Sequence, residues 1–211
     1  MFSIKNGQDG DASSKELSPR LGCNLIGEAI NDIDSRSELV VLDVGAAASS
    51  TVNFFSEKKI RLFFPDLYNA DFISGSQPEL HSSDLVSLFS RAMNVTPDMQ
   101  LDYCFFWDIF SFLKRSYILA MLQALSPNLG EKTRGYCIGN MHGLDMPNCE
   151  YGIADTCVLT QANRNGTSLK TYAHSLSELT SLLKPFVISK NRLLVKGRIE
   201  YLLVDSSLST E

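Results

Sequence analysis

The sequence lacks several features that would assign it to a common class of protein. Its 211 residues contain no G-x-x-x-x-G-K-[ST] loop, which disfavours a kinase or a GTPase. No apolar run reaches the roughly 18 residues that a membrane span requires. The first twenty residues hold no apolar stretch of the kind that forms a secretory signal. We therefore expect a protein without a membrane segment, cytoplasmic by default.

Charge and cysteine spacing disfavour two further classes of protein, those that bind nucleic acids in general and those that bind metal ions through cysteines. Acidic residues outnumber basic ones by 24 to 19, so the net charge is -5 and no basic field supports general nucleic-acid binding. The five cysteines form no closely spaced pair of the metal-binding kind, and Cys104 and Cys137 lie inside apolar, strand-like runs. We expect reduced thiols and no metal site.

The composition that remains is that of a globular chain with one principal domain. Apolar residues make up 44% of the sequence, and no internal repeat or low-complexity linker divides it. Residues 1–20 are rich in Gly, Ser, Asp and Lys and predict a mobile tail. Residues 21–33 carry spaced apolar side chains and predict an amphipathic helix that packs on the domain or covers its site. We thus divide the chain into residues 1–37, a tail with a lid helix, and the domain 38–211.

Alternating strand and helix patterns predict the architecture of that domain. The apolar runs read as parallel strands that are covered on both faces, and the segments between them have helical spacing. This alternation predicts an α/β fold with right-handed crossovers. The expected strands are Leu39 to Val44, Ile60 to Phe64, Leu101 to Trp107 and Arg134 to Gly139; the expected helices are Ser50 to Glu57, one that begins near Ser83 or Asp84 as its cap, and Phe110 to Leu125; Tyr68 to Gln77 reads as a loop.

The last third of the chain predicts a different ending. Ser175 and Glu178 have the spacing of a capping box and predict a helix that runs to Lys184. The strands that follow are joined around Gly197, by a connection far too short for a crossover, so they form an antiparallel hairpin. The predicted fold is a doubly wound, mostly parallel Rossmann-like sheet that ends in an antiparallel hairpin.

Acidic residues stand at the ends of the predicted parallel strands. Asp43 and Gly45 follow the first strand, Asp66 follows the second, and Asp108 follows the strand that ends at Trp107. A tight turn after one strand, with an acid roughly 20 residues further on, is how such a sheet holds a nucleotide-type cofactor at its carboxyl edge.

These motifs resemble those of the class I S-adenosylmethionine-dependent methyltransferases over roughly residues 38–205. VVLDVGAAASSTVNFF is similar to the first cofactor motif of that family, FFPDLY to its acidic second-strand motif, and LDYCFFWDIF to its fourth-strand motif. YAHSLSELTSLLKPF is similar to the helix that precedes the antiparallel seventh strand. The family loop has an acid followed by three alternate glycines; here Asp43, Gly45, Ala47 and Ser49 take those positions, so one glycine remains.

The resemblance implies S-adenosylmethionine as the cofactor and assigns residues to it. Asp66 would accept hydrogen bonds from the ribose hydroxyls, Asp84 would meet the adenine amino group, and Trp107 would wall the pocket. The plainer alternatives are a turn acid, a helix cap and a core residue. The implied cofactor site consists of Asp43, Gly45, Ala46, Ala47, Asp66, Leu67, Asp84 and Trp107.

Three residues are candidates for acid or base catalysis. Asp108 would orient an acceptor or act as a base if burial raises its pKa. His142 or His174 would take a proton from an oxygen or nitrogen acceptor, since imidazole titrates near working pH. Solvated loop histidines are the plainer alternative. Residues 143–170 would form an insertion that faces the acceptor. Methyl transfer needs little covalent help, because positioning supplies most of the effect.

Three functions remain open. The first is a methyltransferase that acts on a small molecule or a protein side chain, because no Asn-Pro-Pro-Tyr or Pro-Cys element of a base methyltransferase follows the fourth strand. The second is a catalytically silent, methyltransferase-like binding or regulatory module, which the thinned glycine loop suggests. A nicotinamide-dependent reductase ranks last, because the G-x-G-x-x-G pattern is incomplete. A homodimer stays open in each case.

Overall fold

The computed structural model describes residues 19–31, 33, 38–140, 146–164 and 168–206, and the structural statements below concern these residues. The strands are β1 (Arg20–Gly22), β2 (Leu39–Asp43), β3 (Ile60–Phe63), β4 (Tyr103–Trp107), β5 (Arg134–Asn140), β6 (Cys149–Asp155), β7 (Val158–Asn163), β8 (Phe186–Leu193) and β9 (Arg198–Asp205). The α-helices are α1 (Ile26–Ala29), α2 (Ser49–Phe55), α3 (Asp71–Ser74), α4 (Ser82–Met93), α5 (Arg115–Leu125) and α6 (Leu176–Leu182). The 3-10 turns are η2 (Leu67–Asn69), η3 (Ile109–Phe112), η4 (Ser126–Asn128) and η5 (Val195–Gly197).

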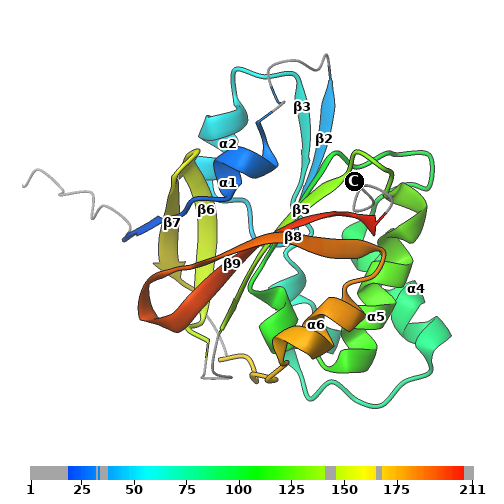
Figure 1. Cartoon of the computed structure of the whole chain (residues 1–211). Helices are drawn as coiled ribbons and strands as arrows, with labels where there is room; N and C mark the ends of the chain where they lie inside the picture. The colour runs from blue at the N-terminus through cyan, green and yellow to red at the C-terminus, as the bar shows by residue number, and fades with distance from the viewer. Residues whose placement is uncertain (1–18, 32, 34–37, 141–145, 165–167, 207–211) are drawn as a thin grey trace, which may run out of the picture.

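A six-stranded sheet with the order β3-β2-β4-β5-β9-β8 runs through the molecule (Figure 1). Strands β3, β2, β4 and β5 are parallel to one another. Strand β9 is antiparallel to both of its neighbours, β5 and β8, so β8 runs in the same direction as the parallel strands. The predicted antiparallel closing hairpin is confirmed.

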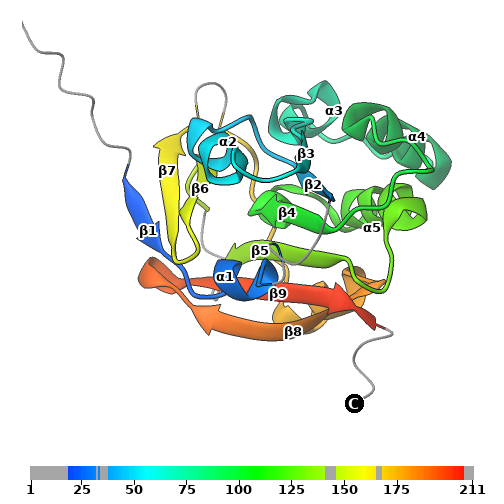
Figure 2. The same cartoon turned by 90° about the horizontal axis from the view of Figure 1, so that it is seen from above.

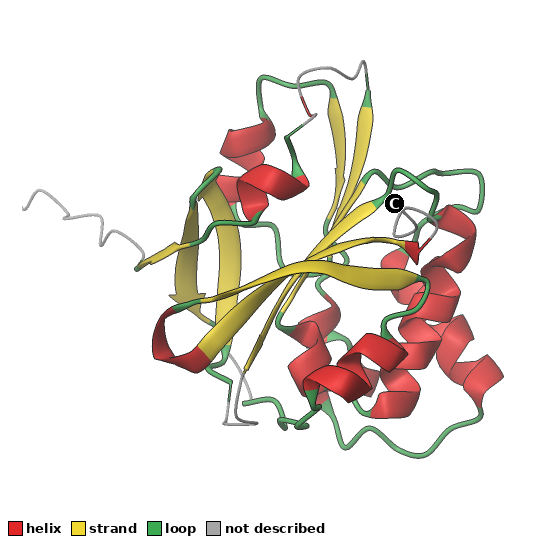
Figure 3. Ribbon diagram, in the orientation of Figure 1, coloured by secondary structure: helices red, strands yellow, loops and turns green. Residues whose placement is uncertain are grey.

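Helices cover both faces of this sheet, as Figures 1 and 2 show. Helices α4, α5 and α6 lie on one face, and α1 and α2 lie on the other. A second, antiparallel sheet with the order β1-β7-β6 lies on the side of α2. The secondary-structure colouring of Figure 3 makes the two sheets and the helical layers easy to separate. The doubly wound α/β class predicted from the sequence is confirmed.

The core consists of the parallel strands and the helix faces turned toward them. Every residue of β4 is buried, as expected for a central strand that is covered on both faces. On α4 the buried residues are Leu85, Phe89 and Met93, which recur at the spacing of one helical face. The edge strand β8 is different, since Lys190 and Arg192 are exposed there, and charged side chains hinder pairing with another chain.

Four expectations for local structure need correction. The helix predicted over 110–125 is broken, because Lys114 is extended and its backbone N–H donates to the side chain of Gln77. Helix α4 has His81 at its N-cap, so Ser83 and Asp84 lie inside its first turn. The expected loop 68–77 contains η2 and α3. The insertion 143–170 holds the β6–β7 hairpin, which its mixed polar content did not indicate.

The predicted helix 21–33 is mostly wrong, although its burial was anticipated. Residues Arg20–Gly22 form β1, which pairs with β7, and only Ile26–Ala29 is helical. The buried carboxylate of Glu200 accepts hydrogen bonds from the backbone N–H groups of Asn24 (2.8 Å) and Leu25 (3.1 Å), which fixes this segment on β9. The segment therefore packs on the domain. Of the tail predicted over 1–20, residues 1–18 lie outside the described residues, and Arg20 belongs to β1. The division at residue 37 stays a prediction.

The predicted capping box at the start of α6 is confirmed. The Ser175 hydroxyl accepts a hydrogen bond from the Glu178 N–H at 3.2 Å, as a capping box requires. All five cysteines are free. Among the helices described, none has the length and hydropathy needed to cross a bilayer.

Candidate functional site at the carboxyl edge of the sheet

Asp43 ends β2 and is fully buried. Its Oδ1 accepts hydrogen bonds from the Gly45 N–H (2.9 Å) and from the indole Nε1 of Trp107 (2.5 Å), whereas its Oδ2 is buried without a partner. Burial raises the pKa of Asp43 to about 7, because desolvation outweighs the two hydrogen bonds. One oxygen of the Asp43 carboxyl group is thus hydrogen-bonded, and the other can accept a hydrogen bond from one further donor.

The turn after Asp43 leads into α2 through small residues. Ala47 and Ser49, which stand where the family pattern has glycine, are exposed, and Ala46 is half-buried. Their side chains therefore lie at the surface of the turn rather than inside the fold. Gly152 of β6 presses against this region, because a Cβ there would lie 2.2 Å from the Ser50 hydroxyl oxygen.

Asp66 follows β3 in the left-handed conformation, with φ at 45°. Its Oδ2 accepts a hydrogen bond from the Asn69 side chain at 2.7 Å, and its Oδ1 is buried without a partner. The side chain does not cap η2. The next residue, Leu67, is buried and donates its N–H to the Val44 carbonyl at 2.9 Å, which holds this turn beside the turn after β2.

Trp107 ends β4 and also has a positive φ, 48°, which is rare for a bulky side chain. A register shift between β4 and β5 precedes it, and such irregularities redirect side chains near functional sites. Its ring stacks between Phe105 (centroids 5.5 Å apart) and Tyr151 of β6 (5.7 Å apart). The indole is therefore packed in the core, as the plainer alternative predicts, and is also hydrogen-bonded to Asp43. Its role as a pocket wall stays a prediction.

A group of five buried polar residues lies beside Trp107, and we call it the edge cluster: Tyr68, Asp108, Tyr151, Arg164 and Arg198. The Tyr68 hydroxyl donates to Asp108 Oδ1 at 2.7 Å, and Asp108 Oδ2 has no partner. The Arg164 guanidinium lies 3.6 Å from the centre of the Tyr68 ring. Desolvation raises the pKa of Asp108 to about 6, against the opposing effects of Tyr68 and Arg164.

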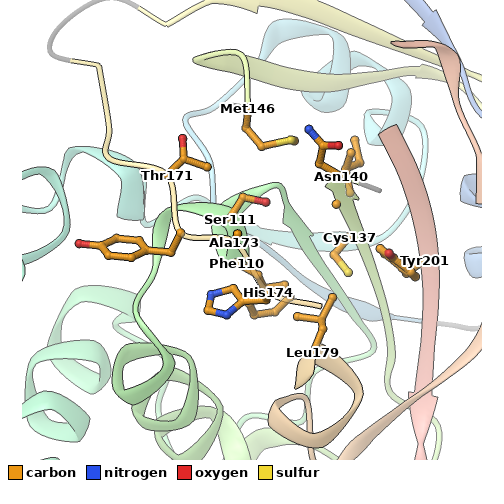
Figure 4. Close-up of a pocket in the computed structure, with 13 residues that line it drawn as sticks. Phe110, Ser111, Cys137, Asn140, Met146, Thr171, Ala173, His174, Leu179 and Tyr201 are labelled. Atoms are coloured by element: carbon orange, nitrogen blue, oxygen red, sulfur yellow. The ribbon is translucent and has the colours of Figure 1, made fainter. Parts of the chain in front are cut away.

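His174 lies apart from the edge cluster, in the wall of a small cavity at the end of β5 (Figure 4). Its Nε2 is 2.9 Å from the Leu113 carbonyl oxygen, and its Nδ1 is 3.8 Å from Glu178. Tyr201 and Cys137 line the cavity from the sheet, and Met146 lies above it in the view of Figure 4. The cavity volume is about 30 Å³, which suits a water molecule rather than a whole acceptor.

The structure brings most of the predicted site residues to one edge but leaves Asp84 and His174 aside. Asp43, Gly45, Leu67, Trp107 and Asp108 are buried there, and the half-buried Asp66 adjoins them.

Asp84 is exposed in the first turn of α4, which packs along α5. His142 lies outside the described residues.

Sequence reasoning missed three members of the edge cluster: Tyr151, Arg164 and Arg198. Arg164 and Tyr151 come from the insertion, where no periodic pattern distinguished them, and Arg198 was read only as part of the closing turn. Tyr68 stood inside the FFPDLY motif without a role. In the described part of the chain, no group of three His, Cys, Asp or Glu residues could hold a metal ion.

The chain is similar to several solved structures at low sequence identity. No protein-family model and no curated sequence matches the chain. Among solved structures, an S-adenosylmethionine-dependent methyltransferase from Clostridium acetobutylicum is 16% identical, with a TM-score of 0.48 over 85% of this chain and 89% of that one. Magnesium protoporphyrin IX methyltransferase from Synechocystis, with bound S-adenosylmethionine, is 12% identical, with a TM-score of 0.49 over 86% and 76%.

A glycopeptide N-methyltransferase complexed with S-adenosylmethionine is 9% identical, with a TM-score of 0.44 over 86% of this chain and 94% of that one. These solved structures are S-adenosylmethionine-dependent methyltransferases with varied substrates. At such identities the residues of this chain have to carry any functional argument themselves.

Proposed function

We propose that this protein is an S-adenosylmethionine-dependent methyltransferase that acts on a small molecule or a protein side chain. The observation that carries the proposal is Asp66, whose Oδ1 is buried without a donor at the carboxyl end of β3. A buried carboxylate oxygen without a partner is costly, and a ribose hydroxyl would satisfy it. The left-handed backbone at Asp66 and Trp107 adds support, because strained residues cluster at binding sites.

The residues present fit the cofactor at both of its ends. Asp66 would hold the ribose, and Asp43, whose Oδ2 also lacks a donor, would accept a hydrogen bond from the amino group of the methionine part. The turn formed by Gly45, Ala46 and Ala47 would approach that part with its backbone. The cofactor would supply a methyl group that is already activated on a sulfonium, and this chain would supply position and exclude water.

Asp108 is the residue best suited to handle a proton in such a reaction. It is fully buried, and its pKa of about 6 lies close to neutrality, where a general base is effective. The Tyr68 hydroxyl fixes one of its oxygens and leaves the other open. His174 would act only on a group that reaches its separate cavity.

Calorimetric titration with S-adenosylhomocysteine tests the proposal. We expect saturable binding to the wild type, and a loss of about ten- to a hundredfold in affinity for Asp66→Ala, since hydrogen bonds to a charged group contribute about 1.5–3 kcal/mol each. Asp98→Ala is the matched control, because Asp98 is exposed in the loop before β4. Equal affinity in the wild type and Asp66→Ala would refute the assignment of the ribose site.

One observation favours the catalytically silent module instead. The indole N–H of Trp107 already occupies Asp43 Oδ1, and its ring is held between Phe105 and Tyr151. If this arrangement is rigid, the Trp107 ring would keep the methionine part of the cofactor away from Asp43. An absence of heat with S-adenosylhomocysteine at high concentration would support this second function.

A further inference from the structure

Two buried arginines of the edge cluster keep donors without partners. Arg164 is 7% exposed and Arg198 is 6% exposed, yet Nη1 of Arg164 and Nε of Arg198 have no hydrogen-bond partner. A guanidinium has five N–H donors and no acceptor, so it can be satisfied only by acceptors brought to it. These two donors are therefore left for an acceptor other than the side chains and backbone of the described residues.

Neutral groups hold the two side chains in place. Arg164 donates through Nε to the Asn148 side chain at 3.1 Å and through Nη2 to the Cys149 carbonyl, and its plane lies over Tyr68. Within the described ranges, the Arg198 side chain donates through Nη1 to the Tyr151 hydroxyl, at 3.5 Å. The charges of both arginines are therefore fixed in position but not neutralised by these contacts.

Asp108 is the one carboxyl group of the edge cluster, which also contains two guanidiniums. Its Oδ1 is taken by Tyr68, and its charge interacts with Arg164. With Asp108 ionised, the five residues carry one negative and two positive charges. The excess charge of the edge cluster is positive, so a ligand group bound here would be an anion.

The strand order places the edge cluster on the side where an acceptor would bind. The proposed cofactor residues follow β2 and β3, whereas Arg198 begins β9, which is separated from β2 by β4 and β5. Asp108, at the end of β4, lies between these two sides. Arg198 also pairs in register with Asn140, a residue of the cavity wall in Figure 4.

We propose that Arg164 and Arg198 form a subsite for a carboxylate group of the methyl acceptor, with the hydroxyls of Tyr68 and Tyr151 beside it. The planar fork of arginine matches the two oxygens of a carboxylate. The proposal rests on the proposed methyltransferase function and narrows its substrate class to carboxylic acids. The carboxylate of the cofactor's own methionine part is the competing source of this group, and the experiment separates the two.

Thermal unfolding of the wild type with malonate is the first measurement. We expect a saturable rise in melting temperature that neither sodium chloride at the same ionic strength nor uncharged malonamide produces. Sodium phosphate at the same ionic strength is run in parallel. A rise with phosphate and none with malonate, or equal behaviour of malonate and chloride, would overturn the proposal.

Variants then locate the effect. Arg198→Gln and Arg164→Gln are expected to weaken malonate binding at least tenfold, and the lysine variants to weaken it less, because lysine keeps the charge but lacks the fork. Arg115→Gln is the matched control, since Arg115 is exposed and pairs with Glu178 at the surface. If a glutamine variant does not fold, the lysine variant and the comparison of malonate with malonamide in the wild type still test the carboxylate subsite.

S-adenosylhomocysteine binding distinguishes this proposal from the proposed function. Unchanged affinity in Arg198→Gln, together with lost malonate binding, supports an acceptor subsite. A loss of S-adenosylhomocysteine affinity in both arginine variants would assign the arginines to the cofactor and overturn the acceptor subsite. Malonate binding without any S-adenosylhomocysteine binding in the wild type would refute the methyltransferase function, and with it the acceptor, while leaving an anion site.

Discussion

At the scale of single residues, the site is defined by carboxylates that are each only half satisfied. Asp43, Asp66 and Asp108 each have one oxygen that accepts a hydrogen bond and one buried oxygen that does not. A fold that needed these acids only for stability would pair both oxygens. Three unpaired oxygens along one edge of the sheet are therefore better explained by a ligand than by packing.

Asp43 makes the stability of the protein depend on pH. Its ordinary pKa of 3.8 rises to about 7 in the fold, so between these values the folded state keeps a proton that the unfolded chain has lost. Stability from this residue is therefore greatest below about pH 4 and falls as the pH rises to 7. The effect is on the order of 4 kcal/mol at most, from about 1.4 kcal/mol per pKa unit.

Urea unfolding between pH 4.5 and 7.5 tests this expectation. In Asp43→Asn the unfolding free energy should fall less over this range than in the wild type, because the amide does not ionise. Asp71→Asn is the control, since Asp71 is exposed on α3. If the unfolding free energy of the wild type and of Asp43→Asn changed equally with pH, the pKa of Asp43 would be the same in the folded and the unfolded chain, and the prediction would be wrong.

At the scale of elements, the β6–β7 hairpin is hydrogen-bonded to the first turn of α2, next to the turn that follows β2. The Thr51 hydroxyl accepts a hydrogen bond from the Ile153 N–H at 3.0 Å, and the hydroxyl oxygens of Ser50 and Thr160 are 2.7 Å apart. Gly152 permits this close approach. The insertion thereby fixes Tyr151 against Trp107. The hairpin therefore contributes a side chain to the proposed site.

Gly152→Ala should disturb this contact. The added methyl carbon would lie 2.2 Å from the Ser50 oxygen and 2.8 Å from the Ala48 Cβ, and overpacking of this kind costs about 1–3 kcal/mol. Chemical denaturation measures the change, and we expect Ser50→Gly to recover part of it. The matched control is Gly22→Ala in β1, where nothing lies within 4 Å of the new carbon. Equal effects of the two alanine variants would contradict the role assigned to Gly152.

At the scale of the whole molecule, Glu200 joins the beginning of the described chain to its end. Its buried carboxylate accepts from Asn24 and Leu25 of the N-terminal segment and from the Tyr136 hydroxyl at 3.1 Å. Glu200 is separated in the sequence from Asn24 by 176 positions and from Leu25 by 175 positions. The segment before β2 is thus held by the sheet rather than lying loosely over the site.

Glu200→Gln should release that segment. Replacing the carboxylate removes charge-assisted bonds worth about 1.5–3 kcal/mol each, so residues 20–30 should exchange their amide hydrogens faster than in the wild type. Hydrogen exchange followed by mass spectrometry measures this, with α4 as the internal reference. Faster exchange of equal size in α4 would indicate global destabilisation and refute a local tether.

The sequence predicted the parallel sheet well and the site only in part. Apolar runs such as Tyr103–Trp107 carry their own signal, because a strand buried on both faces must be apolar. Asp43 and Asp66 were found from the strand ends that precede them. Arg164 and Arg198 could not be found, because their role arises from contacts between β6, β7 and β9, and such long-range packing leaves no local pattern.

Trp107 has one more consequence, because it is the only tryptophan of the chain. Its indole is 1% exposed, stacked on Tyr151 and hydrogen-bonded to Asp43. The tryptophan fluorescence of the protein therefore comes from a single indole at the centre of the proposed site. Ligand entry, protonation of Asp43 and displacement of the β6–β7 hairpin can each be followed optically in the unlabelled wild type, without the background that a second tryptophan would add.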